Sequence, residues 1–371
     1  MPLPQEIHLQ IAIGVFALVL MIQLFYYLRF FTGVFQTVEP TNRKDEGVSV
    51  IICTRNNRPG LEANLPVILS QDYPNFEVVV VNDGSTDGSI AYLDELAKVE
   101  PRLKVLHLDI DDRFHRGKKF AQTIGIKGAK HNWMLFTDSD CTPESDQWIR
   151  LMTSYFSESK QLVLGVGRHQ RQVGFINWVV QLETFHTALL YINFALKGKP
   201  YMGIGRNLAY KRDLFFSVKG FASHQHILSG DDDLFVNETS TNTNVAVCLD
   251  SGSHTLSTIK GGLAWWVRQK KRHYSTGRLY RSDDKMRLAT YFFSLFFFYA
   301  AFIYLLTTNV WMITLIGFGI RFFVQGIVLF RNTRKLGYEP YFWVYPFMDL
   351  GILLIQLLVG IRGYFHKPKS W

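Results

Sequence analysis

The chain has 371 residues, a formal net charge of +9, and an aromatic-rich composition with 30 phenylalanines and 17 tyrosines. This length suffices for one large or two small domains, and the positive charge favours anionic partners: nucleic acid, anionic lipid or phosphorylated substrates. Cys53, Cys141 and Cys248 lie far apart and include no C-x-x-C pair. The pattern argues against a zinc or disulfide framework and predicts reduced core thiols.

The first predicted element is a membrane anchor over residues 1–31. Residues 11–28 carry no charged side chain, and with their apolar flanks they are long enough to cross a bilayer of about 30 Å. The preceding residues contain no lysine or arginine, which favours an uncleaved anchor over a signal peptide. Residues 32–47 are predicted to be a linker. The positive-inside rule places the next domain in the cytosol, because basic residues follow the anchor: Arg29, Arg43 and Lys44.

Residues 48–260 are predicted to form one α/β domain. Apolar runs that indicate buried strands alternate with segments of helical periodicity, and the loops between them are short. This alternation is typical of a mostly parallel sheet covered by helices. The strands of the first half are predicted at 48–53, 76–81, 103–108 and 133–137, and the helices at 61–69, 88–98 and 117–130.

Polar clusters follow three of these strands, at 54–57, 83–87 and 138–140. Ligands of such sheets bind at the carboxyl ends of the strands, so the three clusters are predicted to meet in one crevice. Asp138 and Asp140 are two positions apart and can face one ligand, and two close carboxylates favour a hard divalent cation such as Mg²⁺ or Mn²⁺. A capped turn is the alternative interpretation of this pair.

Known phosphate-binding signatures are missing from the first half of the chain. No G-x-G-x-x-G follows the first strand and no G-x-x-x-x-G-K-[ST] is present, which disfavours a dinucleotide-binding fold and a P-loop. Lys118 instead stands at the start of a predicted helix. A helix N-terminus with a lysine can hold a phosphate, and a solvated basic turn is equally open from the residues alone.

The second half of the domain contains a strand at 162–167, a long apolar helix at 175–196, a glycine-rich turn at 203–210 that runs into a strand, and a strand at 244–249. Three consecutive aspartates, Asp231, Asp232 and Asp233, precede an apolar residue. Carboxylates this close need cations, water or a shared proton. The alternative is an N-cap cluster that opens a helix.

The C-terminal part is predicted to be membrane-associated. Residues 261–287 mix tryptophans and basic residues and predict an amphipathic interfacial helix on an anionic membrane face, a position that disfavours nucleic acid. Residues 288–371 are predicted to hold about three spans, at 288–308, 309–330 and 341–361. Charges inside a membrane are usually paired, so Arg321 and Asp349 are expected to face the protein and to contact each other.

Taken together, residues 48–287 resemble membrane-bound family 2 glycosyltransferases, the group that includes cellulose, hyaluronan and chitin synthases and ceramide glucosyltransferase. The most specific segment is the N-D-G-S-T-D-G-S run after the second strand. The segments that carry the resemblance are V-I-I-C-T-R-N-N at 50–57, Q-D-Y-P at 71–74, V-V-N-D-G-S-T-D-G-S at 80–89, Gly117-Lys118, and F-T-D-S-D-C at 136–141.

The resemblance implies a GT-A nucleotide-diphospho-sugar transferase domain with N- and C-terminal transmembrane helices, a nucleotide-sugar donor, and Mg²⁺ or Mn²⁺ as cofactor. Asp138 and Asp140 match the D-x-D pair, with Asp140 favoured as the direct metal ligand. The remaining donor-site matches are Asp83 for the nucleotide base, Thr54 and Arg55 in the same pocket, and Lys118 toward the nucleotide.

The family also places an acidic pair after the D-x-D motif to supply the general base. Asp231, Asp232 and Asp233 match this pair, and the register favours Asp232 as the base, with Asp233 second. A Q-x-x-R-W motif of the family is matched by Gln269 and Arg272, which assigns Arg272 to the diphosphate. His273 replaces the tryptophan, which argues against long-chain processive synthesis.

The function predicted from these residues is inverting, metal-dependent transfer of a sugar from a nucleotide-sugar, with UDP favoured, to a membrane-associated lipid or glycan acceptor. The expected setting is cell-envelope or polysaccharide biosynthesis at the plasma (bacterial inner) membrane, with the catalytic domain in the cytosol. A processive polysaccharide synthase, a sugar nucleotidyltransferase, a transporter and a catalytically inactive membrane scaffold are the alternatives.

Overall fold

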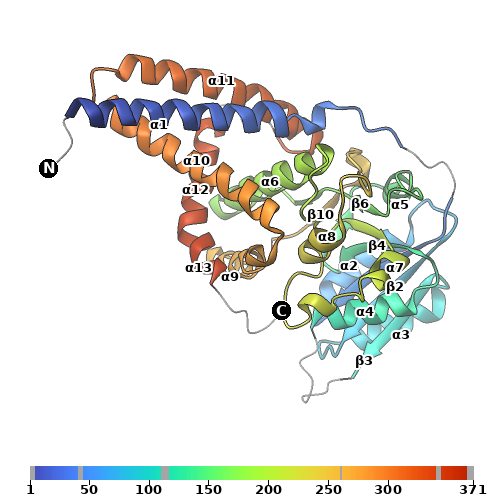
Figure 1. Ribbon diagram of the computed structural model, residues 1–371. Helices are drawn as coiled ribbons and strands as arrows, with labels where there is room; N and C mark the ends of the chain where they lie inside the picture. Colours follow the sequence, from blue (N-terminus) through green and yellow to red (C-terminus); the bar gives the residue numbers. More distant parts are fainter. Residues whose placement is uncertain (1–4, 41–44, 110–116, 260, 340–343, 366–371) are drawn as a thin grey trace.

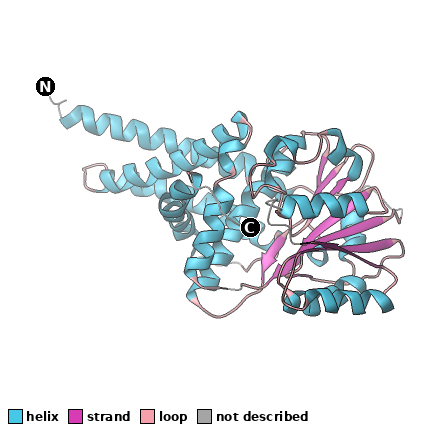
Figure 2. Cartoon of the chain, turned by 90° about the horizontal axis from the view of Figure 1, so that it is seen from below, coloured by secondary structure: helices cyan, strands magenta, loops and turns pink. Residues whose placement is uncertain are grey.

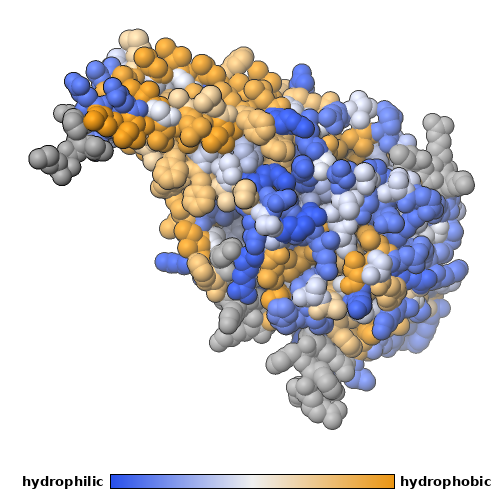
Figure 3. Space-filling model, in the orientation of Figure 1, coloured by the Kyte–Doolittle hydropathy of each residue, from blue (hydrophilic) through white to orange (hydrophobic). Residues whose placement is uncertain are grey.

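The computed structural model describes residues 5–40, 45–109, 117–259, 261–339 and 344–365. An α/β domain and a group of long apolar helices lie side by side, and in this view the N-terminal helix α1 (Gln5–Phe25) lies between α10 (Ser282–Leu306) and α11 (Trp311–Lys335) (Figure 1). Apolar side chains gather over this helical group and hydrophilic ones over the α/β domain (Figure 3).

A seven-stranded sheet forms the centre of the α/β domain, in the order β3-β2-β1-β4-β8-β6-β9. The neighbours β3, β2, β1 and β4 are parallel, which confirms the mostly parallel sheet predicted from the alternation of elements. β8 runs antiparallel to both β4 and β6. The strands are β1 (Val48–Thr54), β2 (Phe76–Asp83), β3 (Leu103–Leu108), β4 (Trp133–Asp138), β6 (Leu162–Leu164), β8 (Leu208–Lys211) and β9 (Val245–Val247).

A second, three-stranded sheet of order β5-β10-β7 lies beside the large one. The segment predicted as one strand over 162–167 is divided between the two sheets, because β6 ends at Leu164 and β7 begins at Gly167. The strands of the small sheet are β5 (Cys141–Pro143), β7 (Gly167–His169) and β10 (Thr255–Ser257).

Helices cover both faces of the large sheet (Figure 2). Alternate residues of β1 point to opposite faces, so Val50 and Ile52 belong to one apolar core and Ile51 to the other. The core that holds Ile51 also contains Phe194 of α6 and Tyr291 of the helical group, so the α/β domain packs against that group. The helices of the domain are α2 (Arg58–Leu69), α3 (Ser89–Val99), α4 (Lys118–Gly128), α5 (Trp148–Thr153), α6 (Phe175–Leu196), α7 (Arg212–Ser217), α8 (Asp233–Thr239) and α9 (Leu263–Tyr274).

Three helical stretches within the described residues are long and apolar enough to cross a membrane: Glu6–Phe35, Ser282–Leu306 (α10) and Trp311–Lys335 (α11). The segment predicted as interfacial over 261–287 folds as α9 and a short turn, and its last residues already belong to α10, which begins at Ser282. Asp284 near the start of α10 forms ion pairs with Arg281 and Arg287. The third C-terminal stretch folds as α12 (Tyr345–Ile355), a π-helical turn Gln356–Gly360, and α13 (Ile361–Tyr364). Residues 341–343 of that predicted span lie outside the described residues.

Arg321 of α11 and Asp349 of α12 form a buried ion pair, as predicted. Gln23 of α1 accepts a hydrogen bond from Arg321 at 2.9 Å, and the Tyr299 hydroxyl of α10 donates to Asp349 at 2.6 Å. One polar network therefore joins four helices.

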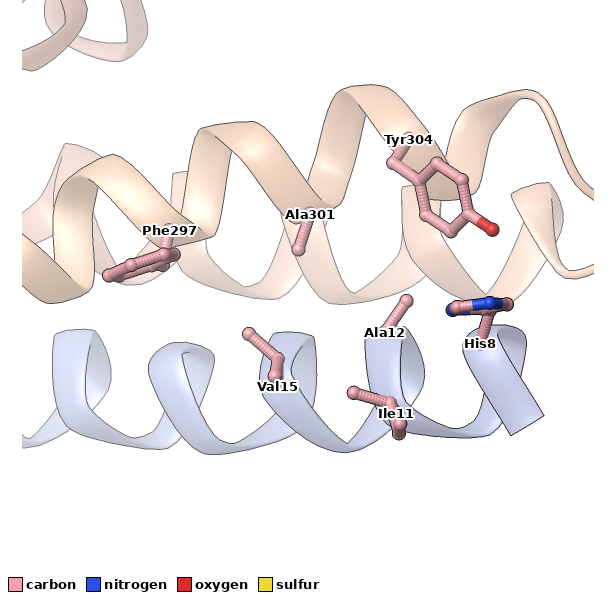
Figure 4. Close-up of a pocket in the computed structure, with 7 residues that line it drawn as sticks. All are labelled: His8, Ile11, Ala12, Val15, Phe297, Ala301 and Tyr304. Carbon is pink, nitrogen blue, oxygen red and sulfur yellow. The ribbon is translucent and has the colours of Figure 1, made fainter. Parts of the chain in front are cut away.

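A shallow groove lies between α1 and α10, away from this network (Figure 4). His8 and Tyr304 lie at one end of it and Phe297 lies at the other, with small or aliphatic side chains between them.

Candidate active site

Three neighbouring strand ends bring the predicted polar clusters together. In the pairing register Cys53 of β1 lies opposite Asp138 of β4, and Thr54 lies opposite Asn82 of β2. The strand ends therefore lie along one edge of the sheet, as parallel pairing requires. That all three polar clusters share one crevice stays a prediction.

Asp138, Asp140 and Cys141 form the metal-capable group of this edge. Their ligand atoms all lie within 4.8 Å of one another, at the turn between β4 and β5. The Cys141 thiol is buried, and burial raises its pKa well above its ordinary value, so it is a poor ligand at neutral pH. The two carboxylates remain, and oxygen donors of this kind suit Mg²⁺ or Mn²⁺.

Lys118, the first residue of α4, links the two acidic groups of the site. Its Nζ lies 2.9 Å from Asp138 Oδ1 and 2.9 Å from Asp231 Oδ2. Burial disfavours the lysine charge, but the neighbouring carboxylates outweigh it and raise the pKa of Lys118 well above its ordinary value. Burial likewise opposes the charge on Asp138, yet Lys118, Arg206 and Arg272 together hold the pKa of Asp138 below its usual range.

Asp232 is the acid of the cluster with the pKa suited to proton transfer. Its Oδ2 accepts a hydrogen bond from the Gly205 N–H at 2.6 Å, and its Oδ1 accepts one from the Asp233 N–H at 2.8 Å. Burial, together with the charges of Asp231 and Asp233, nevertheless raises the pKa of Asp232 to about 7. It is the only one of the three acids that is partly exposed.

Two glycines make this arrangement possible. Gly230 has φ +92°, a left-handed conformation that favours glycine, and it turns the chain into the acid cluster. A Cβ at Gly205 would lie 3.3 Å from both Asp232 Oδ2 and Lys118 Nζ. The glycine at this position lets the backbone N–H reach the carboxylate.

Asp233 has a different role from its neighbours. Its carboxylate accepts hydrogen bonds from Thr276 and, at 2.7 Å, from the Tyr280 hydroxyl. Both partners belong to the segment between α9 and α10, so Asp233 holds this segment on the α/β domain. Asp232 is also the N-cap of α8, so the N-cap interpretation of this cluster is confirmed alongside the acidic one.

A cavity of about 710 Å³ contains most of the predicted site. It is lined by residues from the D-x-D turn, from the acid cluster and from α9, which lie far apart in the sequence. The predicted residues that line it are Lys118, Asp138, Asp140, Asp231, Asp232, Asp233, Gln269 and Arg272.

Three predicted donor-site residues do not line this cavity. Arg55 and Asp83 form an ion pair at 3.8 Å across the ends of β1 and β2. Thr54 is buried at the end of β1. They lie along the same edge of the sheet as Asp138, so a donor that reaches them must extend along the strand ends.

The sequence interpretation missed the contribution of α6 to this cavity. Glu183, Thr184, His186 and Thr187 line it, and Glu183 forms an ion pair with Lys270 of α9. The signal was present, because these polar residues interrupt an otherwise apolar helix. His169, at the end of the short strand β7, was also missed as a lining residue.

Lys119, next to Lys118, holds the loop that leads into the acid cluster. Its buried Nζ donates to His224 Nδ1 at 2.6 Å, to the His224 carbonyl at 2.7 Å and to the Ile227 carbonyl at 3.0 Å. Burial lowers the pKa of Lys119 to about 8, although Asp231, Asp232 and Asp233 oppose this shift. In the first turn of α4, Lys118 therefore contacts the acidic groups, and Lys119 holds the loop that precedes the acid cluster.

A Lys119→Met variant is expected to lower kcat roughly tenfold with little change in the donor KM, because small misplacements of catalytic groups act on the reaction step. Steady-state kinetics of the purified protein would measure both constants. Lys127→Met, an exposed position on the same helix, is the matched control. An unchanged kcat in Lys119→Met would show that the loop holds its place without this lysine.

Comparison with known proteins indicates the family of the α/β domain. Residues 49–217 match the model of glycosyl transferase family 2. An uncharacterized glycosyltransferase of Haemophilus influenzae is 28% identical over 31% of this chain and 34% of its own length. The poly-beta-1,6-N-acetyl-D-glucosamine synthase of Staphylococcus epidermidis is 28% identical over 29% of this chain and 25% of its own length. The alignments thus span about a third of the first relative and a quarter of the second.

One solved structure resembles nearly the whole chain. The mannosyltransferase PcManGT of Pyrobaculum calidifontis, in complex with GDP-Man and Mn²⁺, has a TM-score of 0.63 and 19% identity, and the alignment covers 95% of this chain and 98% of that one. The likeness confirms the mixed α/β GT-A-like fold. The family match over residues 49–217 adds the reaction class, which is glycosyl transfer. Residues 49–217 thus belong to a glycosyl transferase family 2 domain.

Proposed function

We propose that the protein is an inverting glycosyltransferase that moves a sugar from a nucleotide-sugar, with UDP-sugars as the first candidates, to a membrane-associated acceptor. The observation that carries the proposal is one cavity that is lined both by Asp232, with a pKa raised to about 7, and by the carboxylates of Asp138 and Asp140. A base with a pKa near the working pH is well suited to take a proton from an acceptor hydroxyl.

In the proposed reaction, the acceptor hydroxyl oxygen bonds to the anomeric carbon while the bond to the donor diphosphate breaks. The hydroxyl proton moves to Asp232, and the electron pair leaves with the nucleoside diphosphate. Arg272 and Lys118 hold the diphosphate, since both line the cavity close to Asp138. A divalent ion on Asp138 and Asp140, when bound, would supply charge neutralisation for the departing diphosphate.

The proposed product carries one or a few added sugars rather than a long chain. His273 lines the cavity where the family motif has a tryptophan, so the motif provides no indole ring for stacking a growing glycan. Three helical stretches long and apolar enough to cross a bilayer, and the buried contacts of α1 with α10, support a membrane setting. We propose that this membrane is the bacterial inner membrane and that the α/β domain lies on its cytosolic side. The length profile of the product distinguishes this proposal from a processive synthase, which would give a ladder of long chains.

Release of nucleoside diphosphate tests the function. Purified protein in lipid, with Mn²⁺ or Mg²⁺ and a panel of UDP-, GDP- and dTDP-sugars, is expected to release diphosphate from one donor. Chelation of the metal and Asp140→Ala are each expected to lower this release by at least about a hundredfold, because the developing charge loses its main electrostatic stabilisation.

Two results would contradict the proposal. Release of pyrophosphate in place of nucleoside diphosphate would indicate a nucleotidyltransferase. Full activity of Asp140→Ala would remove the metal site from the mechanism. Glu144→Gln, an exchange of a carboxylate just beyond β5 that does not line the cavity, is the matched control.

A further inference from the structure

The cavity continues past the acid cluster into the membrane helices. Besides the catalytic residues it is lined by Leu288, Ala289, Phe292 and Phe293 of α10 and by Ile352 of α12. α10 is one of the helices long and apolar enough to cross a bilayer. The same cavity therefore extends from the charged acid cluster, the proposed site of proton transfer, to the apolar helices α10 and α12.

The two walls of this inner part differ in chemistry. The α6 wall is polar: the Thr187 hydroxyl donates to Glu183 at 3.0 Å, and Glu183 is paired with Lys270. Thr184 is 4% exposed, and its Oγ1 has no hydrogen-bond partner among the described residues. Buried hydroxyls are nearly always bonded, so this one points to a group that the cavity receives. The wall from α10 and α12 is apolar except for Lys285 near the start of α10.

We propose that this inner part is an acceptor subsite for an amphiphile. A hydroxyl-bearing head group lies against Thr184 and the Glu183–Lys270 pair, and an apolar chain lies against Ala289, Phe293 and Ile352. The assignment rests on the proposed function and names the acceptor class: a lipid whose head group carries the reacting hydroxyl. One polar wall and one apolar wall along the same cavity match such a molecule, whereas a free glycan would leave the apolar wall without a partner.

Protection of an introduced thiol tests the subsite without requiring turnover. The three native cysteines are buried, which keeps background labelling low. Ala289→Cys places a thiol at the apolar wall, and Met286→Cys places one on the same helix at an exposed position that does not line the cavity. Each full-length variant, in nanodiscs of phosphatidylethanolamine and phosphatidylglycerol, would be labelled with a maleimide in the presence of dodecyl maltoside below its micellar concentration or of free maltose.

Dodecyl maltoside is expected to slow labelling of Ala289→Cys at least about fivefold, the effect of four-fifths occupancy, while maltose has no effect and Met286→Cys is unaffected. Adding Thr184→Val to Ala289→Cys should raise the dodecyl maltoside concentration for half-protection about fivefold, the size of one lost hydrogen bond. Thr314→Val, a buried threonine on α11 outside the cavity, is its control.

Two outcomes would overturn the subsite. Equal slowing of both thiols, or no slowing of either, would mean that the amphiphile only enters the disc. Protection by maltose as strong as by dodecyl maltoside would assign the cavity to a free glycan. Neither outcome affects the release of nucleoside diphosphate, so failure of the subsite and failure of the transferase proposal are separate results.

Discussion

An Asp232→Asn variant is expected to lose sugar transfer by between about a hundredfold and ten-thousandfold, the range for a general base. The amide cannot accept the hydroxyl proton, yet its size and its contact with the Gly205 N–H are nearly conserved. Donor binding should survive, because the donor is held by other side chains. Turnover would be measured as product formed from the donor identified by diphosphate release, and binding by calorimetry with the same donor.

The pH profile separates a base from a merely structural carboxylate. Since burial and the neighbouring acids raise the pKa of Asp232 to about 7, kcat/KM of the wild type is expected to rise with pH and to level off above about 7, where the carboxylate predominates. The variant should lack this rise. Asp283→Asn, at an exposed position in the first turn of α10, is the matched control. Near-normal turnover of Asp232→Asn would move the role of base to another residue.

Loss of the ion pair between Arg321 and Asp349 is expected to have the largest effect on stability. Both side chains are at most 1% exposed. Arg321→Met leaves Asp349 buried without its charged partner, and breaking such pairs destabilises by about 3–5 kcal/mol. The change should appear as a lower unfolding temperature in detergent and as a smaller fraction of monodisperse protein.

A double variant tests the cause of this loss. Arg321→Met combined with Asp349→Leu removes both charges, so much of the stability is expected to return, because replacing a buried pair with apolar groups is often neutral. Lys335→Met, an exposed position at the end of the same helix, should leave the unfolding temperature unchanged. A single variant as stable as the wild type would show that Asp349 is satisfied by Gln325 and Tyr299 alone.

Both predictions begin from single residues, but they depend on different levels of structure. The Arg321–Asp349 pair was expected from the sequence because a charge inside an apolar span needs a partner, and few candidates exist there. The register of the family motif favoured Asp232 among the three aspartates, but only the fold shows how the surroundings of the three carboxylates differ. Lys118 neutralises Asp231, and Thr276 and Tyr280 hold Asp233. Asp232 alone is left partly exposed beside the D-x-D carboxylates.

The sequence by itself determined the strands, their polar carboxyl ends and the family. Apolar periodicity and strand-end motifs are local, so β3 and α6 were predicted at the residues where the structure has them. Only the tertiary structure decided how the later segments divide, as with β6 and β7 on separate sheets, and which distant side chains share a cavity. The polar residues of α6 illustrate the reason. They line a cavity only because α9 and α10 border the same space, and contacts between elements far apart in the chain leave no local pattern in the sequence.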